Sequence, residues 1–211
     1  MTNSGNEKID STEQRIFDAA HEVFTQKGMD GAKMQDIAEK AGINKALLHY
    51  YYRTKEKLYE AVAKVVINRA VPALRQVLES ELPLQQKLYG FIDTYIGLIR
   101  LNPFIPLFII SEVNKHPQHF FDKILPADLP QPQNFIKQVE EAIQQGKIRE
   151  INPRHLIINV VSLCVFPFIA RPIARIVLGM SATNMEQFLD ERKEEVKSFV
   201  AAALRPEQVI S

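Results

Sequence analysis

The 211-residue sequence predicts an all-α fold, with a three-helix N-terminal domain followed by a larger helical domain. Apolar residues recur along most of the chain at the three- and four-residue spacing of amphipathic helices. Capping residues, glycines and prolines stand where such helices should begin and end. No stretch alternates between apolar and polar residues for long enough to indicate a sheet.

The first helix is expected at about 12–27, after a disordered tail at 1–10. Ser11 and Gln14 form a capping-box start, and the apolar pattern that follows ends at Gly28. A helix at about 33–41 should end at Gly42, because glycine takes the left-handed conformation without steric cost.

A third helix is expected from the N-cap residue Asn44 to about Tyr51, and Thr54 is the expected N-cap of a fourth. These signals place one domain at 11–53 and a second, which begins with a linking helix, at 54–205. Pro72 and Pro83 should bracket 73–82. Further helices are expected at 84–101, 103–114, 132–146, 152–179 and 183–204. The helix at 152–179 should break near Pro167 or Pro172, and Thr183 should cap the last one. The segment 116–133 should be a loop with a helical piece at 120–124.

Charge is concentrated in one segment, although the formal net charge of the whole chain is only +1. Between Lys33 and Arg69 eight basic residues stand against four acidic ones, whereas after Arg69 the two kinds cancel. A polyanion would therefore meet the chain at this segment.

Composition argues against several classes of protein. Cys164 is the only cysteine, which excludes an intrachain disulfide and a cysteine-based zinc site and suits a reducing cytoplasm. The longest apolar run, 156–170, is shorter than the roughly 20 residues needed to cross a bilayer, so we expect no membrane association. No nucleophile, paired carboxylates or glycine-rich phosphate loop indicates an enzyme, and no cofactor is expected.

A metal site is also not expected. Glu112, His116 and His119 have spacings that could hold a metal on a helix, but Pro117 disrupts the third position.

The segment 37–48 has the pattern of a helix-turn-helix. Ala38 allows two helices to cross closely, Gly42 makes the tight turn, and Ile37, Ile43 and Leu48 form a shared core. In that geometry the second helix can lie in the major groove of DNA. The spacing alone also fits a plain helical hairpin.

The surroundings of the turn favour nucleic acid. The expected helix 44–51 exposes Lys45, His49 and Tyr50, whose side chains can bind phosphates or base edges. Lysines follow at the start of the next helix, where free backbone N–H groups favour a phosphate. A solvated charged face would explain each lysine singly, but explains less well their concentration beside three consecutive tyrosines.

The stretch GAKMQDIAEKAGINKALLHYYYRTKEKLY, residues 31–59, resembles the DNA-binding segment of the TetR family of bacterial transcriptional regulators. The preceding helix, with Ile16, Ala19, Ala20, Phe24 and Gly28, matches as well, so the resemblance covers about 11–62. It implies an N-terminal DNA-binding domain, a fourth helix that links it to a ligand-binding domain, and a dimer built mainly from the last two long helices.

By position, the resemblance implies that Lys45, Ala46, His49 and Tyr50 face the groove or its phosphates, and that Tyr51 and Lys55 match the family's usual aromatic residue and phosphate-binding lysine. The full predicted DNA-binding set is Lys33, Gln35, Asn44, Lys45, Ala46, His49, Tyr50, Tyr51 and Lys55.

Two positions depart from the family pattern. Lys33 stands where the family usually has a threonine or serine that caps the second helix and touches phosphate, so the cap should be lost. Leu47 replaces a commonly polar residue of the recognition helix, which indicates contact with a thymine methyl group or additional core. Sequence preference cannot be carried over from the family.

The predicted ligand contacts are aromatic: Phe91, Tyr95, Phe104, Phe108, Phe121 and Phe166. Any of them could instead belong to an ordinary core, since an all-α domain needs large apolar residues. Few charges converge on this set, which favours a small, mainly apolar ligand.

The resulting interpretation is a ligand-responsive transcriptional repressor. It would bind a pseudo-palindromic site on double-stranded DNA as a homodimer, paired through about 153–178 and 184–204. Two alternatives remain at this point: a helical protein-interaction adaptor, and a small-molecule-binding protein that does not bind DNA.

Overall fold

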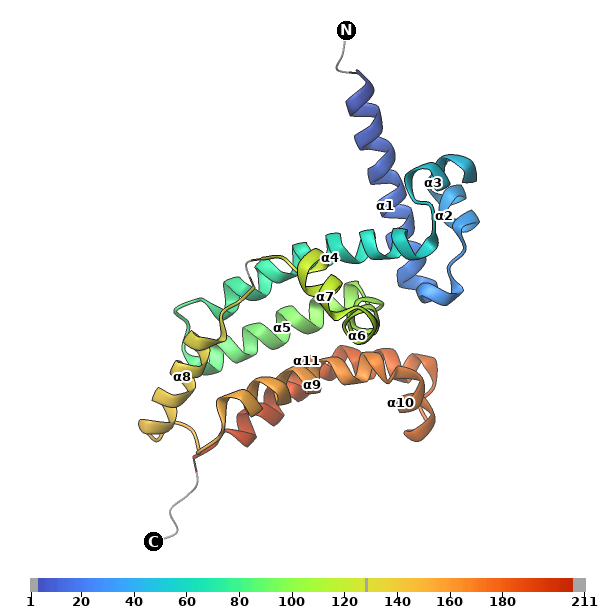
Figure 1. Ribbon diagram of the computed structural model, residues 1–211. Helices are drawn as coiled ribbons and strands as arrows, with labels where there is room; N and C mark the ends of the chain where they lie inside the picture. The colour runs from blue at the N-terminus through green and yellow to red at the C-terminus, as the bar shows by residue number, and fades with distance from the viewer. Residues whose placement is uncertain (1–3, 128, 207–211) are drawn as a thin grey trace. The chain divides into compact units, whose positions relative to one another are not determined.

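The structure is a computed structural model that describes residues 4–127 and 129–206. It confirms the all-α prediction: these residues form helices joined by turns and loops, with no strand among them (Figure 1). The chain folds into two compact units. One contains residues 4–68 and 102–125, and the other contains 69–101 together with 126–206. The predicted functional boundary at residue 53 stays a prediction.

The first unit is built from α1 (Ser4–Gly31), α2 (Met34–Lys40), α3 (Lys45–Tyr51), the first half of α4 (Lys55–Leu78), α6 (Ile105–Lys115), α7 (Pro117–His119) and the π-helix η1 (Phe120–Ile124). α1 packs on α2, and α2 packs on α3. Fully buried side chains from these helices form the core, among them Ile16, Phe24, Ile37, Leu48 and Leu58.

α1 begins earlier than the sequence predicts. Its backbone is helical from Ser4, whereas the sequence places 4–10 in a disordered tail; residues 1–3 of that tail lie outside the described part of the chain. Each residue added to an existing helix gains a hydrogen bond at little further cost in nucleation. At the other end Gly28, with φ 64° and ψ −175°, interrupts the helix where the sequence predicts its end.

The second unit contains the end of α4 with α5 (Leu84–Leu101), α8 (Pro132–Gln144), α9 (Pro153–Ile169), α10 (Arg171–Val177) and α11 (Ala182–Ala203). α5, α9 and α11 pack on one another, and α8 packs on α5 and α9. Their shared core includes Ile92, Ile96, Val160, Cys164 and Val196.

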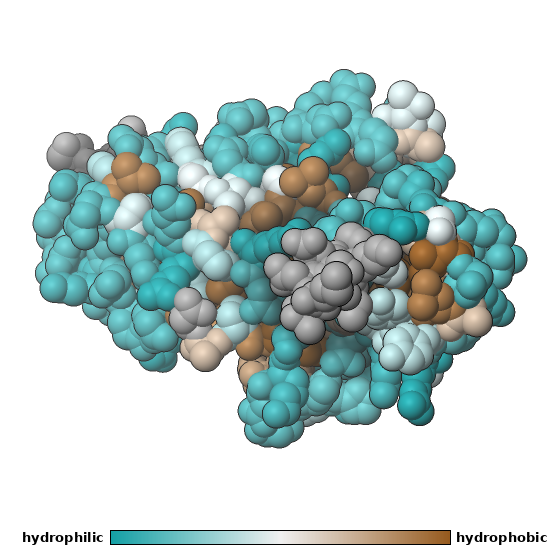
Figure 2. All heavy atoms as spheres, turned by 90° about the horizontal axis from the view of Figure 1, so that it is seen from above, coloured by the Kyte–Doolittle hydropathy of each residue, from teal (hydrophilic) through white to brown (hydrophobic). Residues whose placement is uncertain are grey.

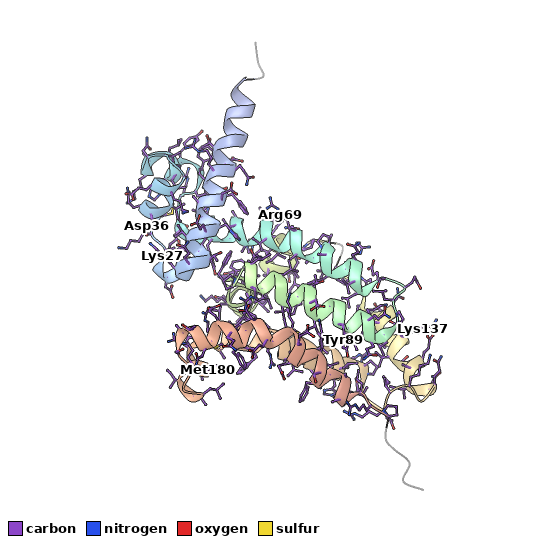
Figure 3. The ribbon with its side chains drawn as sticks, turned by 180° about the vertical axis from the view of Figure 1, so that it is seen from behind. Lys27, Asp36, Arg69, Tyr89, Lys137 and Met180 are labelled. Carbon is purple, nitrogen blue, oxygen red and sulfur yellow. The ribbon has the colours of Figure 1, made fainter. Side chains whose placement is uncertain are left out.

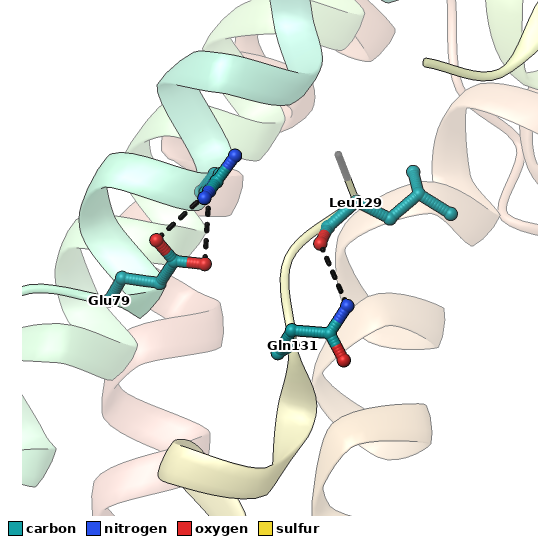
Figure 4. Close-up of polar contacts among 4 residues, drawn as sticks. Glu79, Leu129 and Gln131 are labelled. Carbon is teal, nitrogen blue, oxygen red and sulfur yellow. Dashed lines mark hydrogen bonds and ion pairs between the residues drawn. The ribbon is translucent and has the colours of Figure 1, made fainter. Parts of the chain in front are cut away.

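Proline positions explain two boundaries. α4 continues through Pro72, where the sequence predicts a break, because Val77 and Leu78 beyond it are held by packing: Leu78 lies against the core and Val77 against Gly90 of α5. A paired Arg75 and Glu79 on the same stretch add two hydrogen bonds, from Nε to both carboxylate oxygens (Figure 4). The predicted interruption near Pro172 is confirmed, since α9 ends at Ile169 and Pro172 lies in the first turn of α10.

The cap of the last helix also differs from the prediction. Ser181, two residues before the predicted cap Thr183, accepts a hydrogen bond from the backbone N–H of Asn184. Within the described part of the chain, no single helix is long and apolar enough to cross a membrane. Two pairs of successive helices, α5 with α6 and α9 with α10, reach that length and composition only when the two helices of a pair are counted together across a sharp bend.

Lys87 on α5 is the one charged residue buried among those described, with 4% of its surface exposed. Its ammonium nitrogen is not one of the buried, unpartnered side-chain atoms of the described residues, so the side chain buries its aliphatic stem and keeps its charge at the surface. We therefore expect Lys87→Ala to lower the free energy of unfolding by about 1–2 kcal/mol, because packing of the stem is lost, as measured by urea denaturation.

The matched control is Lys137→Ala on α8, whose side chain is 77% exposed and whose loss should leave stability unchanged. Unchanged stability in Lys87→Ala would show that the stem of Lys87 contributes no packing.

Candidate nucleic-acid interface

The turn between α2 and α3 has the hydrogen bonds of a Schellman motif. The N–H of Gly42 donates to the carbonyl of Glu39, and the N–H of Ile43 donates to the carbonyl of Ala38, both at 3.0 Å. Gly42 has φ 64°, the left-handed conformation that the sequence predicts for it. The turn therefore ends α2 abruptly and sets the direction in which α3 leaves.

The inward faces of α2 and α3 close on α1. Ile37, Ala38 and Leu48 have no exposed surface, and Ile16 and Phe24 of α1 are equally buried. The predicted shared core of Ile37 and Leu48 is present, and the small side chain of Ala38 lies within it. Ile43 is only half-buried.

An arginine of α1 holds the turn from outside. Nη2 of Arg15 donates to the carbonyl oxygens of both Ala41 and Gly42, with a distance of 2.9 Å to the latter. A Cβ atom at position 42 would lie 2.9 Å from the same nitrogen, so the contact also needs the absence of a side chain there. The sequence analysis did not single out Arg15, because a lone arginine on an amphipathic helix carries no periodic signal.

Two ion pairs fasten α1 to α2. Lys27 lies 2.6 Å from Asp36, its labelled neighbour in Figure 3, and Lys40 lies 2.6 Å from Glu22. The hydrogen bonds from the lysines hold the pKa of Asp36 and that of Glu22 below their usual values. All four groups are solvent-accessible, so the pairs orient the helices more than they stabilise them.

The outward face of α3 is accessible along its length. Asn44 caps the helix, its side chain accepting a hydrogen bond of 2.7 Å from the N–H of Leu47. Lys45, Ala46 and His49 are exposed, and Tyr50 is 81% exposed. One short helix therefore has a fully buried Leu48 on one side and predicted DNA-contacting side chains on the other.

His49 has a defined orientation. Nδ1 lies 3.3 Å from the carbonyl oxygen of Arg53, and since a carbonyl only accepts, Nδ1 carries the hydrogen in that contact. In the neutral ring Nε2 is then left as an acceptor, the complement of the amino groups that adenine and cytosine present in the major groove.

The residues around α3 have differing environments. Tyr51 is half-buried with its ring edge against Tyr50, while Lys33 and Gln35 are exposed at the start of α2. Lys33 is the N-cap residue of α2, and its side chain makes no capping hydrogen bond. The predicted loss of the cap is therefore confirmed. Leu47 is 37% exposed. This exposure lies between the two predictions for it, a surface contact with a thymine methyl group and a place in the core.

The first turn of α4 is arranged as an anion-binding helix start would be. The hydroxyl of Thr54 accepts a hydrogen bond from the N–H of Lys57, as expected for its predicted capping role. Lys55 is half-buried and its Nζ donates to the carbonyl of Ala32 at 3.1 Å. An ammonium group has three donors, so this bond positions Lys55 and leaves two donors for a phosphate.

The predicted ligand residues fall into three environments. Phe104 and Phe108 are buried in the first unit and line one cavity there. Phe91 and Tyr95 stack on each other on α5 in the second unit, with ring centroids 5.4 Å apart. Phe121 and Phe166 are more than half exposed. A common ligand site for all six stays a prediction.

Replacement of Arg15 should loosen the turn, because two carbonyl groups lose their charged donor. We expect Arg15→Met to lower the free energy of unfolding by about 1.5–3 kcal/mol, the range for hydrogen bonds to charged groups. Urea denaturation measures the change. The adjacent Gln14→Met, which removes only an exposed bond to Asp18, should change it far less; equal effects of the two variants would contradict a special role for Arg15.

Known proteins match both the first helices and nearly the whole chain. Residues 16–62 match the model of bacterial regulatory proteins, tetR family. The HTH-type transcriptional regulator RutR of Escherichia coli O157:H7 is 26% identical over 202 residues, covering 94% of this chain and 92% of RutR. The HTH-type transcriptional repressor NicS of Pseudomonas putida is 26% identical over 165 residues, covering 76% and 77%.

Among solved structures, the TetR family regulator PfmR of Thermus thermophilus superimposes with a TM-score of 0.62 at 20% identity, covering 92% of this chain and 99% of PfmR, and this likeness concerns the fold. The matched segment contains α2, α3 and the turn between them. Residues 16–62 therefore match the TetR family, and the chain is a DNA-binding transcriptional regulator.

Proposed function

We propose that this regulator is a repressor that binds a pseudo-palindromic operator as a homodimer and is released by a small, mainly apolar effector. The observation that carries the DNA-binding part of the proposal is the two-sided α3. Leu48 anchors the helix, and Lys45, His49 and Tyr50 project from its exposed side. Such a helix reads bases without moving away from its own core.

Groups around α3 supply the expected phosphate contacts. Tyr50 is exposed at its end, Lys33 is exposed at the start of α2, and Lys55 begins α4. The dipole and free N–H groups of the 24-residue α4 favour an anion at the same place. Contacts of this kind fix the register of the protein on DNA and carry no sequence information themselves.

Exposed apolar side chains support pairing through the predicted segments. Ile158 and Phe166 on α9, Ile173 and Ile176 on α10, and Phe199 on α11 are each more than 60% exposed. On the face seen in Figure 2 apolar side chains gather in patches within a mostly hydrophilic surface. Apolar surface of this kind on elements of one unit is typical of a protein–protein interface. A two-fold pair would present two copies of α3 to two half-sites.

The repressor assignment rests on relatives, since NicS is named a repressor. The effector assignment rests on the aromatic residues, of which Phe104 and Phe108 line a cavity. An effector acts only through a difference in its affinity for the DNA-bound and the free forms. A ligand that binds and leaves operator affinity unchanged would contradict this part of the proposal.

Binding to a duplex from the region upstream of the gene, measured by electrophoretic mobility across salt concentrations, tests DNA binding. We expect Lys55→Ala to weaken binding to every sequence and to reduce the slope of log K against log salt by about 1. Lys137→Ala, on exposed α8, is the control and should keep the full slope. Because Lys55 also bonds Ala32, thermal unfolding is measured in parallel; a normal slope in a folded variant removes Lys55 from the phosphate contacts.

Base reading is tested separately by selection from random duplexes. We expect His49→Ala and Lys45→Ala to return sites that differ from the wild-type site, because each removes a side chain exposed on α3. Recovery of an unchanged site by both variants would show that neither residue reads bases.

Self-association is tested by sedimentation velocity. Ile158→Glu combined with Phe199→Glu should weaken the dimer by at least about tenfold, because charges would replace apolar side chains in the interface. Leu101→Glu is the control, since Leu101 is 69% exposed but lies on α5, outside the predicted interface. Equal dissociation by both proteins, or by neither, would place the interface elsewhere.

A further inference from the structure

A cavity of about 1030 Å³ opens within the first unit, against the end of α1 and the start of α4. Its wall is formed by the end of α1 from Phe24 to Asp30, the start of α4 from Glu56 to Glu60, and the segment from Pro103 to His119 that contains α6 and α7. All these residues belong to one compact unit. The volume is at the upper end of the range for small-molecule sites.

The floor of the cavity is aromatic. Tyr59 is its centre, with ring centroids 4.8 Å from Phe24, 5.5 Å from Phe104 and 5.3 Å from Phe108. The four side chains are at most 9% exposed. The hydroxyl of Tyr59 donates to the carbonyl of Phe104 at 3.3 Å, which keeps the ring in place. The cluster therefore lies beneath the cavity, and Tyr59, with 9% of its surface exposed, is the ring most available to an occupant.

The rim of the cavity has an excess of acidic groups. Asp30, Glu56, Glu60 and Glu112 line it, against the basic side chains of Lys27 and Lys115. Lys27 is already paired with Asp36, which lies outside the cavity wall. Glu60 is held by Nε2 of His119 at 2.8 Å. With His116 and His119 neutral, the wall has four acidic side chains against two basic ones.

Backbone dipoles reinforce the negative potential. The helical part of α1 ends at Gly28 and α6 ends at Lys115, and the last turns of both line the cavity, so their carbonyl ends face it with partial negative charge. The N-terminal end of α4 also lies in the wall. There Glu56 accepts hydrogen bonds from its own N–H and from Thr54, which lower its pKa and offset part of the positive end of the dipole.

One polar atom in the wall lacks a partner. The hydroxyl oxygen of Thr25 is fully buried and makes no hydrogen bond with any described residue. Buried hydroxyls are normally satisfied, but this oxygen has no accessible surface, so an occupant of the cavity would reach it only after a local shift of the wall.

From the aromatic floor and the acidic rim, we infer that this cavity binds a small organic cation that carries an apolar or aromatic group. Attraction of a cation to aromatic rings adds to its attraction to the carboxylates, while an anion would meet the acidic rim. The occupant would touch α1, α4 and α6 at once. The inference rests on the proposed function in one respect: the cation would be an effector.

Isothermal titration of the full chain with three probes tests the inference: benzyltrimethylammonium, phenylacetate and benzyl alcohol share one ring and differ in charge. We expect saturable binding of the cation only. Equal binding of all three, or no saturation by the cation up to about 10 mM, would overturn the inference.

Variants locate the site. Glu112→Gln should weaken binding of benzyltrimethylammonium by about three- to tenfold, because one nearby charge is lost, and Ser111→Trp should abolish it by filling the cavity. Glu140→Gln, an exposed acid on α8, is the matched control and should bind normally. Unchanged affinity in both Glu112→Gln and Ser111→Trp would overturn the assignment.

DNA binding separates this inference from the proposed function. If the cation binds with the expected variant pattern and shifts DNA affinity, both stand, and DNA must change the affinity for the cation by the same factor. If the cation binds but DNA affinity is unchanged, the site stands and its effector role fails. If the chain binds no DNA, the proposed function fails while the titrations still decide the site.

Discussion

The left-handed turn at Gly42 is the constraint on which the DNA-binding region depends. It lets α2 end in a Schellman motif and sends α3 across it, and it leaves two carbonyl groups directed at Arg15 of α1. A side chain at position 42 would meet both the unfavourable φ and the guanidinium. The contacts among α1, α2 and α3 therefore meet at Gly42, a residue that has no side chain.

This turn makes α3 a helix with two independent faces. Leu48 is fully buried against α1 and α2, so α3 needs none of its outward residues for stability. Lys45, His49 and Tyr50 are therefore available for recognition, and their chemistry can change among relatives without loss of the fold.

The first unit is more than the DNA-binding segment. Residues 102–125 lie far along the chain but pack with α1 and the start of α4, through the aromatic cluster around Tyr59, the pair of Glu60 with His119, and the contact of His21 with Asn102 at 2.7 Å. Burial of Tyr59, with the nearby charge of Asp30, raises its pKa to about 12, so it remains a neutral hydrogen-bond donor at physiological pH. The cavity lies between these segments. An occupant would therefore contact α4, the helix that begins with the predicted DNA-binding residue Lys55.

The sequence by itself determined the all-α class, the position of the helix-turn-helix, Gly42 as its turn, and Asn44 and Thr54 as caps, because each depends on residues a few positions apart. Only the tertiary structure decided that α4 continues through Pro72, that Arg15 holds the turn, and that 102–125 joins the first unit. These features depend on contacts between residues distant in sequence. Local spacing carries no information about such contacts, since their free energy arises only when the helices pack.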